Sequence, residues 1–400
     1  MARPGGVPPR TGRVWASLLL VAVATVGCGA PVPGESAPSR STTPSTSEPP
    51  EPVTLGMSVS DDESDVEPAR PVTVRAENGR ITGASLIGTH GTKVEHDLRS
   101  GGSLWTTTEP LGYGKTYTLT VRATGEDGAE VEETSTFTTA TPARTVDVWI
   151  NARNDETVGV GMPLIFTFSG AVPDRDAAEE ALTISAEPET EGDFRWFGDD
   201  RVIWRPKEYW ESGTEITVDA RIYGRDLGEG TYGARDKAVT ITVGEKLLIS
   251  ADGQSHRMTV TADDETIRTM PISMGKASSS TPNGTYTVMS EHHGYTLDSS
   301  TYGVAVDSSD GYRIHVDYAA RLSNSGIFYH SAPWSVGDQG KRNVSHGCLN
   351  LAPEDAAWLM ERSKRGDPVT VVNAGGQTLE PTDGWSVWQM SWEEWQSGAA

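Results

Sequence analysis

Cys348 and the residues near it carry the clearest chemical signal in this 400-residue chain. Residues 345–350 read Ser-His-Gly-Cys-Leu-Asn, and a sharp turn at the glycine before the thiol can direct backbone N–H groups at an oxyanion. His330 lies upstream, between Tyr329 and Ser331. An imidazole within hydrogen-bond reach activates a thiol, provided that a second group fixes the imidazole tautomer. The pattern predicts acyl transfer through a thioester, with Cys348 as nucleophile and His330 as base.

Other interpretations of Cys348 stay open at this point. A zinc site with His330 and His346 uses suitable ligand types, but the regular Cys-x-x-Cys or His-x-x-x-His spacing is absent. A cysteine peptidase or amidase would share the acylation step and differ in using water to resolve the thioester. A protein that binds without catalysis is the rival from another class, and an intact Cys348 with His330 argues against it.

The segments that must position these residues are short and strand-like. Glycine and proline are frequent, with 43 and 24 copies, which favours an all-β fold. Residues 53–142 and 143–245 each predict an immunoglobulin-like β-sandwich, with alternating strands such as 117–121 and 164–168. Neither contains a nucleophile with a base, so we expect both to act as spacers.

Residues 246–373, which contain Cys348, continue the strand pattern and add one helix. We predict this helix between Pro353 and Arg365, because proline suits the first turn, acidic residues follow it, and Gly366 can end it. Apolar residues recur within it at i, i+3 and i+4, a spacing that gives one face for packing on a sheet.

The C-terminal residues 374–400 are rich in tryptophan. Four tryptophans follow at spacings of three, four and three residues, which is compatible with one face of a helix: Trp385, Trp388, Trp392 and Trp395. So short an apolar stripe needs a partner to bury it. We therefore expect this tail to pack on the preceding domain rather than to form a carbohydrate-stacking surface.

The N-terminus is typical of an exported protein. Residues 1–27 contain three arginines and then an apolar run, which predicts a signal peptide, and Cys28 follows in a sequence that resembles a bacterial lipobox, with Thr25 where leucine is usual. We expect Cys28 to carry a lipid anchor, against the alternative of plain signal cleavage. Residues 28–52 are rich in Pro, Ser and Thr and predict a disordered stalk. The net charge of −23 argues against nucleic acid as a partner.

The motifs around Cys348 resemble the L,D-transpeptidase (YkuD) signature, in the form found in mycobacterial and other actinobacterial enzymes. The likeness rests on residues 330–334, His-Ser-Ala-Pro-Trp, and on residues 345–350, where several spaced residues must match together. It extends to the order of the segments, from the lipoprotein leader to the tryptophan-rich tail. The resemblance implies a YkuD-type β-sandwich catalytic domain in residues 246–373.

The resemblance also implies roles for the matching residues. Cys348 would be the nucleophile, and His330 the base that the backbone carbonyl of Ser331 orients. Backbone N–H groups of Gly347 and Cys348, with Tyr312, would form an oxyanion hole, and His346 would be a second imidazole in the catalytic group. Further residues would bind substrate or form an active-site flap that begins at Leu297, where a relative has Met: Ser325, Gly326, Trp334, Asn350, Leu297 and Tyr302.

A peptidoglycan stem peptide is the substrate that the resemblance implies. The donor would be a tetrapeptide ending in diaminopimelate and D-Ala, and the thioester would pass to the side-chain amine of another diaminopimelate, which forms a 3-3 cross-link. The same thiol would be acylated by carbapenems. The resemblance implies no metal and no cofactor, and it places the protein outside the cytoplasm, anchored to the cell membrane and facing the cell wall.

Overall fold

The computed structural model describes residues 51–308 and 311–398. The predicted signal peptide, the expected lipid site at Cys28 and the stalk up to residue 50 lie outside the described residues. Strands dominate the rest and confirm the all-β fold expected from the sequence. No helix in these two stretches has the length and apolarity needed to cross a membrane.

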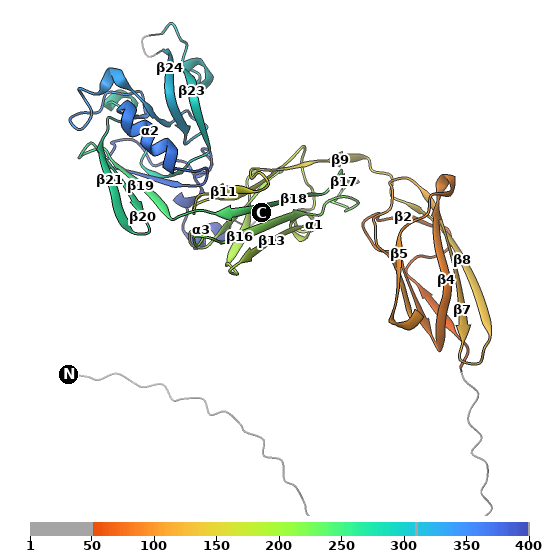
Figure 1. Cartoon of the computed structure of the whole chain (residues 1–400). Helices are drawn as coiled ribbons and strands as arrows, with labels where there is room; N and C mark the ends of the chain where they lie inside the picture. Colours follow the sequence, from red (N-terminus) through yellow and green to blue (C-terminus); the bar gives the residue numbers. More distant parts are fainter. Residues whose placement is uncertain (1–50, 309–310, 399–400) are drawn as a thin grey trace, which may run out of the picture. The chain divides into compact units, whose positions relative to one another are not determined.

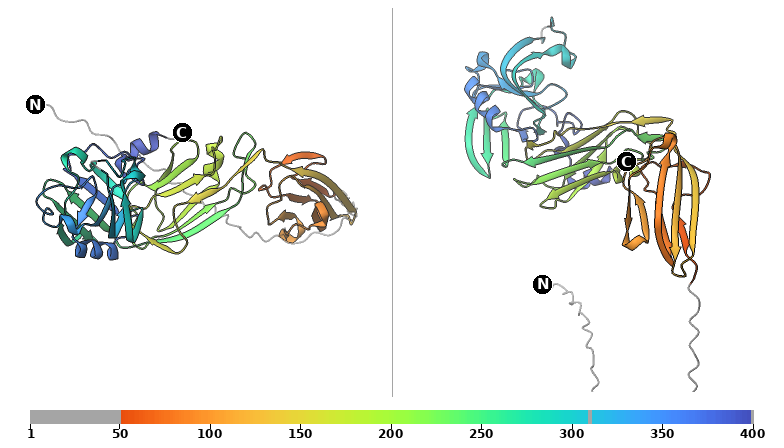
Figure 2. Two further views of the ribbon diagram at one scale, coloured as in Figure 1. Left: turned by 90° about the horizontal axis from the view of Figure 1, so that it is seen from above. Right: turned by 45° about the vertical axis from the view of Figure 1, so that its right-hand side comes forward.

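Residues 54–139 form a first β-sandwich, drawn in orange to yellow in Figure 1 and seen from two more sides in Figure 2. One sheet has the strand order β1-β3-β6-β5 and the other β2-β8-β7-β4. The strands are β1 Thr54–Met57, β2 Glu63–Val66, β3 Thr73–Glu77, β4 Gly79–Gly88, β5 His96–Arg99, β6 Leu104–Thr107, β7 Thr116–Gly125 and β8 Glu130–Thr139, with short 3₁₀ turns η1 Thr89–Gly91 and η2 Ser100–Gly102. Buried and less buried residues alternate along β7, so one face of its sheet packs inward around Trp105 and Leu119.

Residues 144–243 form a second sandwich. Its main sheets have the orders β10-β12-β15-β14 and β11-β18-β16-β13, and β9 pairs with β17. The elements are β9 Arg144–Val146, β10 Val148–Ile150, β11 Glu156–Val158, β12 Leu164–Phe168, α1 Arg175–Glu180, β13 Leu182–Glu187, β14 Gly192–Trp196, β15 Arg201–Pro206, β16 Glu215–Ala220, β17 Thr231–Gly233 and β18 Lys237–Val243. Helix α1 was not predicted from the sequence. It is short, and its N-terminus is capped by the Asp174 side chain, which accepts from the Ala177 N–H.

The C-terminal domain contains two sheets and the predicted helix. A five-stranded sheet has the order β21-β20-β19-β27-β22, and a four-stranded sheet the order β23-β24-β25-β26, with β23 and β24 forming a long hairpin (Figure 1). The elements are β19 Leu247–Asp252, β20 Arg257–Ala262, β21 Glu265–Pro271, η3 Ala277–Ser279, β22 Gly284–Thr287, β23 Ser290–Asp298, η4 Ser299–Tyr302, β24 Arg313–Arg321, β25 Phe328–Ser331, η5 Pro333–Ser335, β26 Leu349–Leu351, α2 Pro353–Arg362 and β27 Pro368–Val372. Helix α2 buries Ala356, Leu359 and Met360 against the domain core, as their spacing indicates.

The tail contains η6 Val387–Gln389 and α3 Trp392–Ser397, and its tryptophans pack mainly on the second sandwich. Trp395 is fully buried in that core, and its Nε1–H donates to the Asp193 carbonyl at 3.0 Å. The tail also contacts the C-terminal domain, since the Arg365 guanidinium lies 5.1 Å from the Trp385 ring centroid and the Gln389 side chain donates to the Thr285 carbonyl at 2.7 Å. The expectation that the tail packs on that domain therefore covers only part of its contacts. Strand β15 explains why the tail lies on the second sandwich, because this strand is buried on both faces. One face lines the sandwich core, and Arg205 on the opposite face contacts the tail.

Arg365 joins the C-terminal domain to the second sandwich. Its Nη1 lies 2.6 and 2.8 Å from the two Glu156 carboxylate oxygens, and its Nη2 donates to the Asn151 carbonyl at 2.5 Å. Backbone bonds add to this junction, since the Gly159 N–H donates to the Arg365 carbonyl at 2.8 Å. The second sandwich thus shares a core with the tail and an ion pair with the C-terminal domain.

Candidate active site

Parallel pairing of β25 with β26 brings Cys348 and His330 to one face of the four-stranded sheet. His330 is in register with Asn350. Since side chains two residues apart in extended chain point the same way, Cys348, just before β26, shares the face of Asn350. Residues far apart in the sequence therefore converge because two short strands are neighbours.

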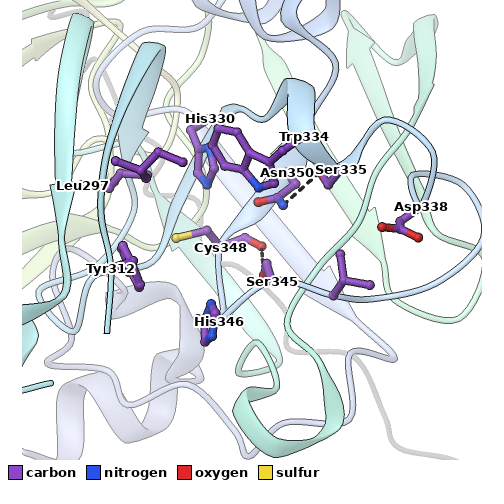
Figure 3. A pocket seen from close by; sticks show the side chains of 12 residues that line it. Leu297, Tyr312, His330, Trp334, Ser335, Asp338, Ser345, His346, Cys348 and Asn350 are labelled. Atoms are coloured by element: carbon purple, nitrogen blue, oxygen red, sulfur yellow. Dashed lines mark hydrogen bonds between the residues drawn. The ribbon is translucent and has the colours of Figure 1, made fainter. Parts of the chain in front are cut away.

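These side chains line a pocket of about 300 Å³ (Figure 3). Apolar and polar groups mix in its wall, as is usual for sites that orient a ligand through a few polar contacts. The lining residues are Leu297, Tyr312, Ile314, His330, Trp334, Ser335, Asp338, Val344, Ser345, His346, Cys348 and Asn350. Trp334 is half exposed at the rim, with its ring centroid 5.8 Å from that of His330.

The Cys348 thiol is buried, with 6% of the residue exposed. Its Sγ donates to the Gly326 carbonyl at 3.5 Å. Burial raises the pKa of the thiol to about 11, and the backbone N–H of Phe328 offsets part of that rise. The free site therefore holds a neutral thiol, since a thiolate would be poorly solvated here.

The His330 imidazole is oriented by the chain that follows it. Its Nδ1 lies 2.9 Å from the Ser331 carbonyl oxygen. Because a carbonyl only accepts, Nδ1 carries the proton and Nε2 is the basic nitrogen. Burial lowers the pKa of His330 to about 4, and the Ser331 carbonyl works against that shift. The imidazole is thus neutral near pH 7 and able to accept a proton.

A hydrogen-bonded turn fixes the segment before Cys348. The Ser345 hydroxyl donates to the Cys348 carbonyl at 2.6 Å and accepts from the Gly347 N–H at 3.1 Å, while Thr281 donates to the Gly347 carbonyl at 2.7 Å. Gly347 has φ +127°, and a Cβ there would lie 2.9 Å from a methyl carbon of Ile327. Only glycine fits this turn without strain. In the absence of a ligand its N–H is engaged by the Ser345 hydroxyl, and the expectation that it donates to an oxyanion stays a prediction.

Asn350 offers an unused acceptor to the pocket. Its Nδ2 donates to the Ser335 hydroxyl at 3.1 Å, and its buried Oδ1 has no hydrogen-bond partner among the residues that the structure describes. Figure 3 shows the amide oxygen turned toward Cys348 and His330. A buried acceptor without a partner is costly, so a ligand N–H is well suited to fill this position.

The remaining predicted residues divide into two groups. Tyr312, Leu297 and His346 line the pocket, where the His346 ring lies 5.6 Å from that of Tyr312 and its Nε2 lies 3.0 Å from the Lys276 Nζ. Burial raises the pKa of Tyr312, which keeps its hydroxyl proton in place.

The other group lies outside the lining of the pocket: Ser325, Gly326 and Tyr302. Ser325 instead binds a carboxylate of the tail, and the Tyr302 ring covers Gly326, where an added Cβ would lie 2.5 Å from the ring.

Sequence reasoning missed several contributors. Ser335 and Asp338 line the pocket, Thr281 supports the turn before Cys348, and Asp383 of the tail binds Ser325. The only local signal was that Ser335 and Asp338 lie between the two recognised motifs. Among the described residues, no group of three or more His, Cys, Asp or Glu side chains is arranged to hold a metal ion.

The sequence and structure of this chain are similar to those of known proteins in three comparisons. A bacterial Ig domain model matches residues 63–226, and a model of the L,D-transpeptidase catalytic domain matches residues 247–371. The chain is 42% identical over 346 residues to L,D-transpeptidase 2 of Mycobacterium tuberculosis (strain CDC 1551 / Oshkosh), covering 86% of this chain and 85% of the relative. It is 34% identical to L,D-transpeptidase 5 of Mycobacterium tuberculosis (strain ATCC 25618 / H37Rv), covering 88% and 78%. A solved LD transpeptidase in complex with imipenem matches with a TM-score of 0.49 and 38% identity, over 56% of this chain and 99% of that one.

Proposed function

Because the chain belongs to the L,D-transpeptidase family, we propose that it cross-links peptidoglycan stem peptides through a thioester at Cys348. The donor is a stem tetrapeptide that ends in diaminopimelate and D-Ala. The acceptor is the side-chain amine of a second diaminopimelate, so the product joins two third-position residues and D-Ala is released. The observation that carries this proposal is the convergence of Cys348, His330 and Asn350 on one pocket.

The first half-reaction forms the thioester. As Sγ of Cys348 attacks the diaminopimelate carbonyl carbon, Nε2 of His330 takes the thiol proton, and the carbonyl oxygen becomes an oxyanion. The Cys348 N–H and the Tyr312 hydroxyl are the donors suited to this oxyanion, because the Gly347 N–H is already engaged. The bond to D-Ala then breaks, and the imidazolium returns its proton to the leaving amine.

The second half-reaction resolves the thioester. The acceptor amine attacks the thioester carbonyl and gives a proton to His330. The C–S bond breaks, His330 returns that proton to the Cys348 sulfur, and a new amide remains. Attack by water in place of the amine gives a hydrolysed tripeptide, which is the peptidase outcome.

Intact-protein mass spectrometry tests the proposal. The full chain is incubated with a diaminopimelate tetrapeptide and, separately, with imipenem, and the adduct is located by peptide mapping. We expect an adduct at Cys348 with both compounds, a dimeric peptide that lacks one D-Ala, and no adduct or product with Cys348→Ala. Folded protein without an adduct would refute the proposal, and an adduct with only hydrolysed tripeptide would replace it with a peptidase.

We also propose that the protein works outside the cytoplasmic membrane, held there by a lipid on Cys28. The arginine-containing leader and the apolar run before Cys28 support this location. A Cys28→Ala variant expressed in a bacterial host should shift from the membrane fraction to the soluble fraction. Continued membrane association of that variant would count against the lipid anchor.

A further inference from the structure

The loop of residues 322–327, between β24 and β25, controls the surroundings of the Cys348 sulfur. Its Gly326 carbonyl accepts the thiol hydrogen bond at 3.5 Å. Phe328, the first residue of β25, directly follows the loop, and its backbone N–H lowers the pKa of the thiol. Movement of this loop would therefore displace the Gly326 carbonyl and disturb the start of β25, the two backbone regions that act on the thiol.

Asp383 of the tail holds this loop through two hydrogen bonds. Its Oδ1 accepts from the Ser325 N–H at 2.8 Å, and its Oδ2 accepts from the Ser325 hydroxyl at 2.5 Å. Bonds to an ionised carboxylate are roughly twice as strong as bonds between neutral groups. The restraint passes along the loop, because the Ser325 hydroxyl lies 2.9 Å from that of Ser323, which accepts from the Ile327 N–H at 3.0 Å.

Asp383 is itself held from several sides. The Ser386 hydroxyl donates to the Asp383 carbonyl at 2.7 Å, and the Asp383 N–H donates to the Glu380 carbonyl at 3.0 Å. The next residue, Gly384, approaches the loop closely, since an added Cβ would lie 3.1 Å from the Ser323 Cα. From the second sandwich, Arg201 donates to the Gly384 carbonyl at 3.3 Å. The carboxylate is thus presented to the loop by a segment that is itself anchored.

We propose that Asp383 is a positioning residue for the nucleophile, which holds Ser325 and so keeps the Gly326 carbonyl and the Phe328 N–H in place around the Cys348 thiol. This inference rests on the proposed function and adds a residue from the tail to it. Asp383 and Ser325 do not line the pocket. Their loss should therefore slow the chemical step and leave the affinity for the acylating compound unchanged.

The test measures acylation by imipenem in the full chain, as a rate constant against imipenem concentration. Removing the two hydrogen bonds by which the Asp383 carboxylate holds Ser325 should lower the maximal rate constant about tenfold in Asp383→Ala, with the half-maximal concentration changed less than about twofold. Asp383→Asn keeps one acceptor for the Ser325 N–H and should recover most of the rate. Glu393→Gln, a change of an exposed tail carboxylate at the start of α3, serves as the matched control and should behave as wild type.

Ser325→Ala removes the hydroxyl from the loop side of the same contact. If Asp383 acts through Ser325, the double variant should be no slower than Asp383→Ala alone, because two residues of one contact are not additive. Hydrogen exchange of α3 shows whether Asp383→Ala releases the tail. If it does, the maximal rate constant of acylation in Ser325→Ala alone tests the inference.

Two results would overturn the inference. One is an unchanged maximal rate constant in both folded single variants, and the other is a loss expressed only in the half-maximal concentration. Wild-type protein that imipenem fails to acylate would instead remove the proposed function itself, so the two failures are distinguishable.

Discussion

Trp395→Ala should destabilise the second sandwich, although Trp395 belongs to the C-terminal tail. The side chain is fully buried, donates from Nε1 to the Asp193 carbonyl at 3.0 Å, and lies under the Arg205 guanidinium at 4.8 Å from the ring centroid. Truncating a buried tryptophan to alanine costs about 3–5 kcal/mol through lost contacts and the remaining cavity. The unpaired Asp193 carbonyl and the lost cation–π contact act in the same direction.

Hydrogen exchange measured by mass spectrometry gives the assay, because it reports on β14 and β15 separately from the other domains. A loss of about 4 kcal/mol should speed exchange in these strands by about a thousandfold where it proceeds through unfolding. Trp149→Ala is the matched control in the same sandwich, since that side chain is 53% exposed and should cost less than about 1 kcal/mol. Unchanged exchange in β14 and β15 of Trp395→Ala would refute the view that the tail completes this core.

Two further predictions concern pH. The rate of acylation by imipenem should fall in acid with a midpoint near pH 4, because burial lowers the pKa of His330 to about 4 and an imidazolium cannot take the thiol proton. Stopped-flow measurement of the acylation rate against pH would show this. A midpoint at the ordinary histidine value of about 6.5 would contradict it. Burial raises the pKa of Asp367 to about 8, so the contribution of this group to the stability of the C-terminal domain should be greatest below the unfolded value of about 3.9 and fall by up to about 1.4 kcal/mol per pH unit until about pH 8. Asp367→Asn should flatten this dependence in hydrogen-exchange measurements, and an equally steep fall in the variant would assign it to other groups.

Sequence patterns predicted the elements that depend on local alternation. Strand β12 coincides with the expected segment 164–168, and strand β7 contains the expected segment 117–121. Helix α2 begins at Pro353 as predicted, but it ends at Arg362, where Ser363 and not Gly366 follows as the C-cap. These features depend on neighbours along the chain, so a single sequence contains the information.

Long-range contacts were beyond that reasoning. Asp383 and Ser325 meet only because the tail returns to the loop, and neither has an unusual local pattern. The spacing of the tail tryptophans predicted that they are buried, but it did not predict which domain buries them, because an apolar face fits any apolar surface of suitable shape. The hydrogen bond from the Gly347 N–H to the Ser345 hydroxyl was not predicted for a similar reason, since the sequence does not reveal the direction of that turn.

The burial of Cys348 also determines which molecules can modify it. Oxidants and small disulfides attack thiolates that they can reach. A thiol with a pKa near 11, covered by side chains such as Leu297 and Phe328, meets neither condition in the free protein. The nucleophile should therefore persist unoxidised in surroundings that would inactivate an exposed cysteine. The thiol should become reactive only when a ligand fills the pocket and His330 takes its proton.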